Sequence, residues 1–292
     1  MDDHLKILET DVDAWNRWRR DNPEIVPELR GAPLHRRYLH GADLSDTLLG
    51  GANLSEADLT RADLRRTDLR SACLRYTDLR DANLTEADLR CADLKGANFS
   101  YAILHYINLR DADLTEADFS YADLRDADLS GLILFTVRLD GANLQRANLI
   151  GANLSYNNLN GADLSGAHLC EAILNSVKLN GADLRKADLR SANLRGVELH
   201  GANLRNARLQ SARLIGAKLD GADLSGSCLW ETQRAGWSIK GVVCESVYWD
   251  KPAKDETSYC PACLRDCLPR GRRSSCISRT ALVLLKSRLF RR

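Results

Sequence analysis

Four cysteines near the C-terminus form the densest group of potential metal ligands in the chain. The stretch "CPACLRDCLPRGRRSSC" contains a C-x2-C pair followed by two more widely spaced thiols, and its members are Cys260, Cys263, Cys267 and Cys276. A C-x2-C pair supplies half of a tetrahedral zinc site, but the second half lacks the usual spacing. We therefore predict no metal and no cofactor. A poorly ordered basic tail with free thiols, a shifted reading frame and a zinc site are the alternatives for this stretch.

The other residues capable of chemistry are not arranged for catalysis. No serine, histidine and acid are grouped as in a hydrolase, and the glycines occur mostly singly, without a phosphate-binding loop. The histidines are scattered, at His4, His35, His40, His105, His168 and His200. We therefore predict that the protein is not an enzyme.

Composition restricts the class of protein further. The chain has 292 residues and a net charge of +1, yet residues 251–292 carry 11 basic and 3 acidic side chains. The first 30 residues lack the apolar stretch of a signal peptide, and the run "ALVLL" is too short to span a bilayer. Five further cysteines are scattered rather than grouped in a small disulfide framework, so we predict a reducing, cytoplasmic location.

Leucine recurs every five residues over most of the chain. If the central residue of each repeat is called position i, the register runs without insertion from Leu34 to Trp249 and contains 44 repeats. Leucine occupies 38 of these central positions, and alanine occupies position i−2 in 29 repeats. Positions i+1 and i+2 accept almost any residue. Two positions in five are therefore expected to face a core, and the others to face solvent.

Neither a helix nor a flat strand explains this period. On a helix, five residues rotate the side-chain direction by about 140°, so the leucines would not form one stripe. On a flat strand, an odd period sends successive leucines to opposite faces. A coil that turns a corner once per repeat keeps every leucine inside, and its stacked turns can pair at the cross-strand spacing of ~4.8 Å.

The stretches "GADLSGAHLC", "GANLQRANLI" and "GADLRKADLR" resemble the pentapeptide-repeat family, whose pattern is A-(D/N)-L-x-x. The resemblance implies an all-β fold, a right-handed quadrilateral β-helix with four repeats per coil. On that analogy the 44 repeats form about 11 coils and a rod roughly 50 Å long, with residue n beside residue n+20. We divide the chain into an N-terminal helical cap (1–31), the β-helix (32–250) and a basic, cysteine-rich tail (251–292).

The residues before the first repeat are predicted to form a short α-helical cap. An apolar series from Leu5 to Trp15 follows helical spacing, and Pro23 ends any helix. Because the open end of a β-helix is a template for aggregation, we expect Trp15 and Trp18 to pack over the first coil. The lead-in "WNRWRRDNPEIVPEL" also resembles that of some bacterial members of the family.

The pattern weakens after Leu229. Arg234 occupies a central position, and because an unpaired arginine cannot be buried, "ETQRA" is expected to form a bulge or loop. The following residues are expected to form a broader closing coil with these side chains inward: Trp237, Ile239, Val242, Val247 and Trp249.

The most unusual stretch spans residues 99–135. The spacing of 20 predicts that Phe99 stacks on Phe119 inside the coil and that Tyr101 stacks on Tyr121 outside it. Exposed aromatic side chains rimmed by charge are typical of interfaces, and residues 111–130 carry seven acids and one base. We predict a partner-binding surface formed by Tyr101, Ile103, His105, Tyr106, Tyr121 and Phe135. The alternative is an overpacked coil whose tyrosines merely cover the backbone.

One column of outward residues indicates a purely structural role. With residue n beside residue n+20, Asp118 meets Arg138, and Lys178, Glu198 and Lys218 follow in the same column. Opposite charges in such a ladder favour the correct register by ~0.2–1 kcal/mol per pair.

These observations favour a non-catalytic scaffold that binds an unknown protein partner, as repeat solenoids commonly do. The resemblance adds an alternative, because some family members mimic DNA, bind DNA gyrase as dimers and protect it from fluoroquinolones. Duplex DNA carries one negative charge per ~1.7 Å, or about 30 over this rod. Residues 32–250 carry 29 acidic but also 25 basic side chains and show no C-terminal dimerisation helix, so mimicry is not favoured. A third alternative is nucleic-acid binding through the tail. No small-molecule substrate is expected.

Overall fold

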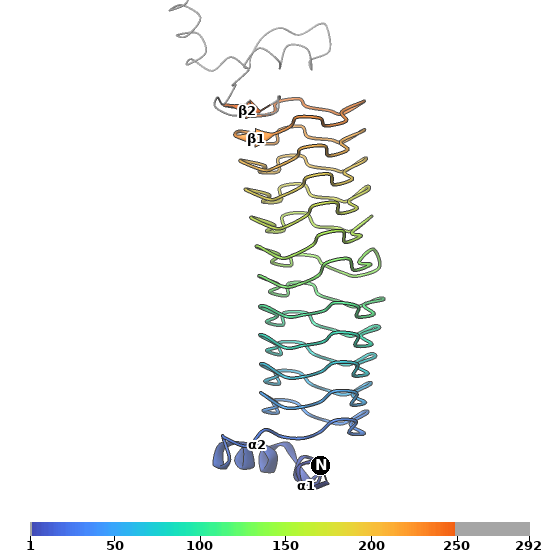
Figure 1. The fold of residues 1–292 in the computed structure, drawn as a ribbon, viewed down its shortest axis with the longest axis vertical. Coiled ribbons are helices and arrows are strands. Elements are labelled where there is room, and N and C mark those ends of the chain that lie inside the picture. Colours follow the sequence, from blue (N-terminus) through green and yellow to red (C-terminus); the bar gives the residue numbers. More distant parts are fainter. Residues whose placement is uncertain (1, 249–292) are drawn as a thin grey trace, which may run out of the picture.

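The computed structural model describes residues 2–248 as a long rod with two helices across one end (Figure 1). The helices are α1 (Asp2–Thr10) and α2 (Val12–Asp21). Among the described residues, the two strands longer than a single bridge are β1 (Ser227–Cys228) and β2 (Val247–Tyr248). No helix within this range has both the length and the apolar character needed to cross a membrane. Trp249 and the cysteine-rich tail, with its zinc alternative, lie outside the described residues.

Each turn of the rod contains 20 residues. Parallel bridges join residue n to residue n+20 from Glu28–Leu48 to Asp223–Val243, and Ser227 of β1 pairs with Val247 of β2 in the same register. The ladder therefore begins at Glu28, ahead of the boundary expected at residue 32. Most bridges involve a single residue, position i−1, because the chain bends at a corner on both sides of it. This geometry is why so few strands exceed one residue.

The corners have a repeating backbone conformation. At each regular corner, the N–H of residue i+3 donates to the carbonyl of residue i, as Ala42 does to Leu39 at 3.0 Å. Residue i+2 is left-handed, and 25 non-glycine residues adopt this conformation, with φ of 57° at Arg61, for example. Left-handed backbone costs an L-residue about 1–2 kcal/mol. Hydrogen bonds between coils must therefore hold the corners in place.

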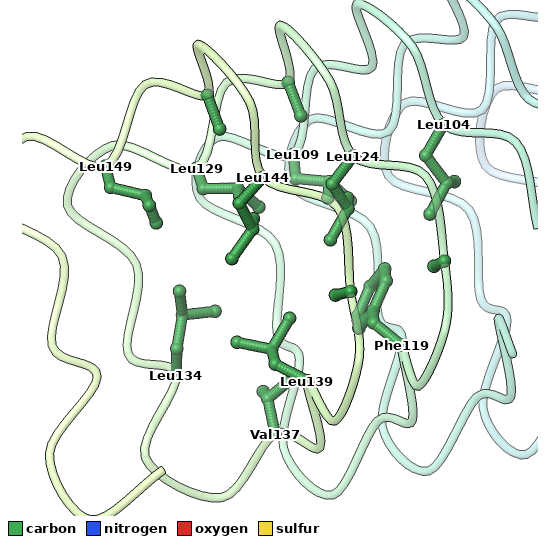
Figure 2. Close-up of a cluster of buried hydrophobic side chains, with 14 of the residues drawn as sticks. Leu104, Leu109, Phe119, Leu124, Leu129, Leu134, Val137, Leu139, Leu144 and Leu149 are labelled. Atoms are coloured by element: carbon green, nitrogen blue, oxygen red, sulfur yellow. The ribbon is translucent and has the colours of Figure 1, made fainter. Parts of the chain in front are cut away.

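The core is a stack of leucine and alanine. The leucines point into the coil from all sides, as Leu104, Leu124 and Leu144 do along one column (Figure 2). Burial of each leucine contributes ~1.5–3 kcal/mol, while alanine at i−2 leaves room for it. The predicted inward stack is confirmed, because the rings of Phe99 and Phe119 lie 4.6 Å apart and within 6° of parallel.

The N-terminal segment forms two helices, and the second of them supplies hydrogen bonds to the first coil. Trp15 is fully buried, and its indole N–H donates to the carbonyl of Asp43 at 2.6 Å. The Asn16 amide donates to the carbonyl of Gly41 at 3.0 Å and accepts from the N–H of Asp43 at 2.8 Å. Arg19, also buried, donates to the carbonyl of Ser45 at 2.8 Å. Side chains thus pair the backbone groups that would otherwise be unpaired at this end.

The expected bulge near Arg234 is wrong, because the register continues through "ETQRA". Gln233 remains bridged to Arg213, and the N–H of Gly216 donates to the carbonyl of Ala235 at 2.8 Å. The Arg234 guanidinium lies over the Trp237 ring, 5.7 Å from its centroid, so an aromatic face accommodates the cation without an insertion. Inward packing of the closing coil involves Trp237, Ile239, Val242 and Val247.

Candidate interaction surfaces

The four sides of the rod provide the frame for locating the predicted residues. We name them by central residues 20 apart: side A contains Leu104 and Leu124, and sides B, C and D contain Leu109, Leu114 and Phe119. Sides A and C are opposite one another. Positions i+1 and i+2 form the corner between one side and the next.

Five of the six predicted partner-binding residues lie on side A and its two corners. Tyr101 and Tyr121 occupy the corner between sides D and A, and their rings stack 5.1 Å apart at 10°, which confirms the predicted outward stack. They are 59% and 58% exposed. Ile103, on the flat of side A, and Tyr106, at the next corner, are also exposed. We call Tyr101, Ile103, Tyr106 and Tyr121 the tyrosine face.

A glycine allows the Tyr121 ring to lie along the rod. A Cβ atom at Gly141 would come within 2.6 Å of the Tyr121 ring, so no larger residue fits there without displacing it. Tyr121 is thus held between Tyr101 on one side and Gly141 on the other. The aromatic surface is therefore ordered before any partner binds.

His105 is not free to bind a partner, because its side chain already contacts Asp123 and Arg125. Its Nε2 lies 2.7 Å from Asp123 Oδ2 and 2.8 Å from the Arg125 guanidinium. Partial burial opposes ionisation of Asp123, but hydrogen bonds from Arg125 and His105 outweigh it and lower the Asp123 pKa. This group forms a polar rim beside the tyrosine face.

Phe135 does not join the other five residues. It lies at the corner between sides C and D and is 52% exposed. With Ile133, which is 65% exposed, it lines a groove of about 490 Å³. The groove lies between residues 111–115 and residues 130–136, on the side of the rod opposite the tyrosine face.

The groove coincides with an interruption of the backbone ladder. Asp113 and Ile133 are 20 residues apart, yet they form no bridge, although the bridges Asp93–Asp113 and Ile133–Asn153 on either side are intact. Of the 29 alanines at position i−2, all within residues 2–248, only Ala112 is not fully buried. One green coil leaves the regular stack at this level (Figure 1). The repeat pattern did not predict this opening.

Large residues at position i−2 account for the interruption. Leu132 and Val137 replace alanine in two successive repeats, and both side chains are buried. Val137 points inward beside Leu134 and Leu139, close to the Phe119 ring column (Figure 2). An overfilled core is relieved by shifting backbone, at a cost of about 1–3 kcal/mol. Single large residues at i−2, such as Val177, leave the ladder intact.

A second, smaller interruption follows on side D. Arg138 and Asn158 form no bridge, although Arg138 remains paired with Asp118 in the preceding coil. The Asn157 side chain donates to the carbonyl of Val137 at 2.6 Å and so takes the place of a backbone donor. Ile133 thus pairs only with the following coil, at Asn153, whereas Arg138 pairs only with the preceding coil, at Asp118. Here the protein supplies its own partner for the carbonyl.

Acidic residues of the rod are largely paired with arginine. In many repeats the aspartate at i−1 binds the arginine at i+1, as Asp68 does Arg70 at 2.8 Å, and this hydrogen bond lowers the Asp68 pKa. The predicted charge column is confirmed at Arg138–Asp118 (3.0 Å) and at Lys218–Glu198 (2.8 Å). The surface is therefore neutralised locally rather than uniformly negative.

The described residues contain no preformed metal site. Within residues 2–248, no three His, Cys, Asp or Glu side chains are grouped so that they could hold an ion. The cysteines of this range, none of them in a disulfide, are Cys73, Cys91, Cys170, Cys228 and Cys244.

The family model for pentapeptide repeats matches the chain in eight copies that lie between residues 38 and 230. The chain belongs to the pentapeptide repeat family, whose members form right-handed quadrilateral β-helices and are generally non-catalytic. No curated protein sequence matches the chain significantly.

The solved structure of HetL gives the same classification, and two further structures are similar to the chain in part. HetL, a pentapeptide repeat protein involved in heterocyst differentiation regulation from the cyanobacterium Nostoc, is 33% identical, with a TM-score of 0.60; the match covers 68% of this chain and 88% of HetL. Rfr23, a pentapeptide repeat protein from the cyanobacterium Cyanothece, is 31% identical over 46% of this chain and 91% of its own, with a TM-score of 0.23. Full-length QnrB1, a plasmid-mediated fluoroquinolone resistance protein, is 17% identical over 64% of this chain and 89% of its own, with a TM-score of 0.32.

Proposed function

We propose that the protein is a non-catalytic scaffold that binds a protein partner through the tyrosine face. The observation that carries this proposal is the ordered, exposed stack of Tyr101 on Tyr121, with Ile103 and Tyr106 on the same side. Tyrosines bury a large area at low conformational cost and are enriched in interfaces. The Arg125–Asp123–His105 group supplies a polar rim next to this apolar centre. We place this function in the bacterial cytoplasm, in keeping with the scattered cysteines.

Gyrase binding by DNA mimicry has weaker support. A mimic needs a continuous field of negative charge, about one charge per ~1.7 Å. Many aspartates of this rod instead form close pairs with arginine, as in Asp88–Arg90 at 2.6 Å. Gyrase is therefore included in the test below as a specified alternative partner.

An affinity experiment with matched variants tests the proposal. The full chain is used as bait in host lysate with chemical cross-linking and compared with the triple variant Tyr101→Ser, Tyr106→Ser, Tyr121→Ser. We expect at least one partner to be lost with this variant, and that partner is then purified and titrated against both baits. Gyrase subunits are probed directly in the same samples.

Three other exposed tyrosines provide the control. They lie outside the tyrosine face and are 53–75% exposed. The control variant changes all three together: Tyr38→Ser, Tyr76→Ser, Tyr156→Ser. We expect the control to retain the partner. Loss from both variants, or from neither, would contradict binding through the tyrosine face. Capture of gyrase together with inhibition of its supercoiling activity would favour mimicry instead.

A further inference from the structure

We propose that the groove on side C is a docking site for an extended, basic segment of a partner protein, which binds by adding a β-strand at the interrupted ladder. The site is opposite the tyrosine face and uses different residues. It goes beyond the proposed function, and either proposal can fail while the other stands.

Unpaired backbone groups on both edges of the groove support strand addition. In a regular coil, the N–H of position i donates to the carbonyl 19 residues ahead, as Leu94 does to Asp113 at 2.8 Å. The corresponding amide of Leu114 has no protein partner among residues 2–248, and the same is true of the amides of Asp111 and Ile133. Backbone groups left in this way form a template for another extended chain. Main-chain hydrogen bonds to such an edge are the basis of β-strand addition.

The groove has room for a ligand. Its volume of about 490 Å³ falls within the range of roughly 300–1,000 Å³ typical of binding pockets. A second groove of about 490 Å³, lined by Asp68, Arg70 and Ser71 among others, lies on coils whose ladder is unbroken. Of the two, it is the groove on side C that combines this space with an interrupted ladder. The combination is therefore a local feature of the two coils that line this groove.

The side chains around the groove define the occupant. Asp111, Asp113 and Glu116 are exposed on one edge. Hydrogen bonds from the Thr115 hydroxyl and amide lower the Asp113 pKa, so this carboxylate is charged at neutral pH. Three other aspartates on these coils are paired with arginines: Asp118, Asp123 and Asp126. The three carboxylates at the groove form no ion pair within residues 2–248, and their charge favours a basic partner.

The opposite edge is apolar at alternate positions. Ile133 and Phe135 are both exposed and are separated by one residue. Leu134 between them is buried, whereas Ile133 on the flat of side C and Phe135 at its corner are exposed beside the groove, where they can contact apolar side chains of a bound strand. The chemistry therefore indicates an extended segment that alternates basic and β-branched apolar residues.

A synthetic peptide of alternating lysine and valine, seven residues long and blocked at both ends, is the probe. It is titrated against the full chain by fluorescence anisotropy, and bound amides are located by hydrogen exchange. We expect saturable binding that weakens with salt. We expect protection to appear in residues 111–116 and 131–136. A peptide with N-methyl groups at alternate backbone nitrogens should bind at least about tenfold more weakly, because it cannot form the ladder.

A repaired chain provides the second test. The double variant Leu132→Ala, Val137→Ala restores the usual alanine at both positions and is expected to close the ladder. It should lose at least about tenfold in peptide affinity. The control, Val177→Ala with Val197→Ala, also replaces two large residues at position i−2 by alanine, but at places where the ladder is already intact. It should bind the peptide like the unchanged chain, and thermal unfolding verifies that both variants are folded.

Several results would overturn the proposal. They include absence of saturable binding, equal binding of the N-methylated peptide, and equal binding by the repaired chain. Protection of the groove amides in the peptide-free chain at low concentration would show that another part of the chain fills the groove. Protection that grows with protein concentration alone would identify a second copy as the occupant.

Discussion

The first coil and the groove on side C are two places where the same backbone ladder ends, and they are treated differently. At the first coil, Trp15, Asn16 and Arg19 bind the backbone of residues 41–45, with three carbonyls and one N–H satisfied by side chains. At the groove, the amides of Leu114 and Ile133 have no protein partner among the described residues.

This difference shows what an edge needs in order to be stable within one chain. The N-terminal edge is capped by a helix whose side chains reach the backbone at hydrogen-bonding distance. The edge at side C is created by overfilled packing within the rod, and no element of residues 2–248 covers it. We infer that the first edge is structural and that the second is available for binding.

Removal of Trp15 should give the largest effect, because it breaks the capped edge. Trp15→Ala deletes a fully buried ring and its hydrogen bond to Asp43 and is expected to cost about 3–5 kcal/mol of unfolding free energy. Denaturant titration measures this loss. Val26→Ala, at a 53% exposed site, is the control and should change stability by roughly 0.5 kcal/mol or less. Equal effects would contradict a capping role for Trp15.

Removal of Asn16 should show how much the hydrogen bonds of the cap contribute to stability, apart from the packing of Trp15. Asn16→Ala leaves Trp15 in place but removes the partners of the Gly41 carbonyl and the Asp43 N–H, at an expected cost of about 1–3 kcal/mol. Hydrogen exchange should then be faster at the first coil than elsewhere. The neighbouring exposed residue provides a control, Arg17→Ala, which should leave exchange unchanged.

Acidification should destabilise the regular coils, because ion pairs between adjacent coils are lost. Their advantage in stability over the coils at the groove should then become smaller. Hydrogen bonds from Arg66, Arg146 and Lys218 in adjacent coils lower the pKa values of Asp46, Asp126 and Glu198. Their ordinary values are 3.8 for aspartate and 4.5 for glutamate. Because the folded values are lower, their stabilisation is complete above about pH 4.5 and is lost as the pH falls through the folded values.

Thermal unfolding between pH 7 and pH 3 tests this dependence. We expect Tm to be nearly constant at the upper end and to fall towards the lower end. The double variant Asp46→Asn, Asp126→Asn should show a shallower fall, since two of the responsible carboxylates are absent. An unchanged slope would contradict the role assigned to these ion pairs.

Corner substitutions should have the smallest effect. Ser71 is left-handed, with φ of 56°, so Ser71→Gly relieves backbone strain and should stabilise the chain by about 1 kcal/mol or less. Gly151→Ala, at φ of 67° with open space around the site, should destabilise it by a similar amount. Denaturant titration of both variants measures the two changes in unfolding free energy. The same sign for both changes would contradict strain at the corners.

The sequence predicted regular features better than exceptions. The period of five led directly to the 20-residue turn and to the stacks of Phe99 on Phe119 and Tyr101 on Tyr121, because these depend only on register. Arg234 was misjudged, since its contact with Trp237 depends on three-dimensional placement within the closing coil.

The groove shows why part of the candidate site could not be predicted. Leu132 and Val137 are visible departures from alanine, but a similar departure at Val177 has no effect on the ladder. The opening depends on two large residues in succession, of which Val137 lies close to Phe119 (Figure 2). Such cumulative packing cannot be obtained from a repeat pattern alone. Phe135 was therefore assigned with the tyrosines although it lines the opposite side of the rod.

Amide hydrogen exchange of the full chain tests the central claim most directly. The amides of Asp111, Leu114 and Ile133 are compared with their counterparts one coil earlier, Cys91, Leu94 and Asp113, all of which donate to backbone carbonyls at 2.8–3.0 Å. We predict exchange at least about 100-fold faster in the first group, because no ladder bond has to open. Equal protection of the two groups would show that the ladder is continuous and would contradict the account of the groove.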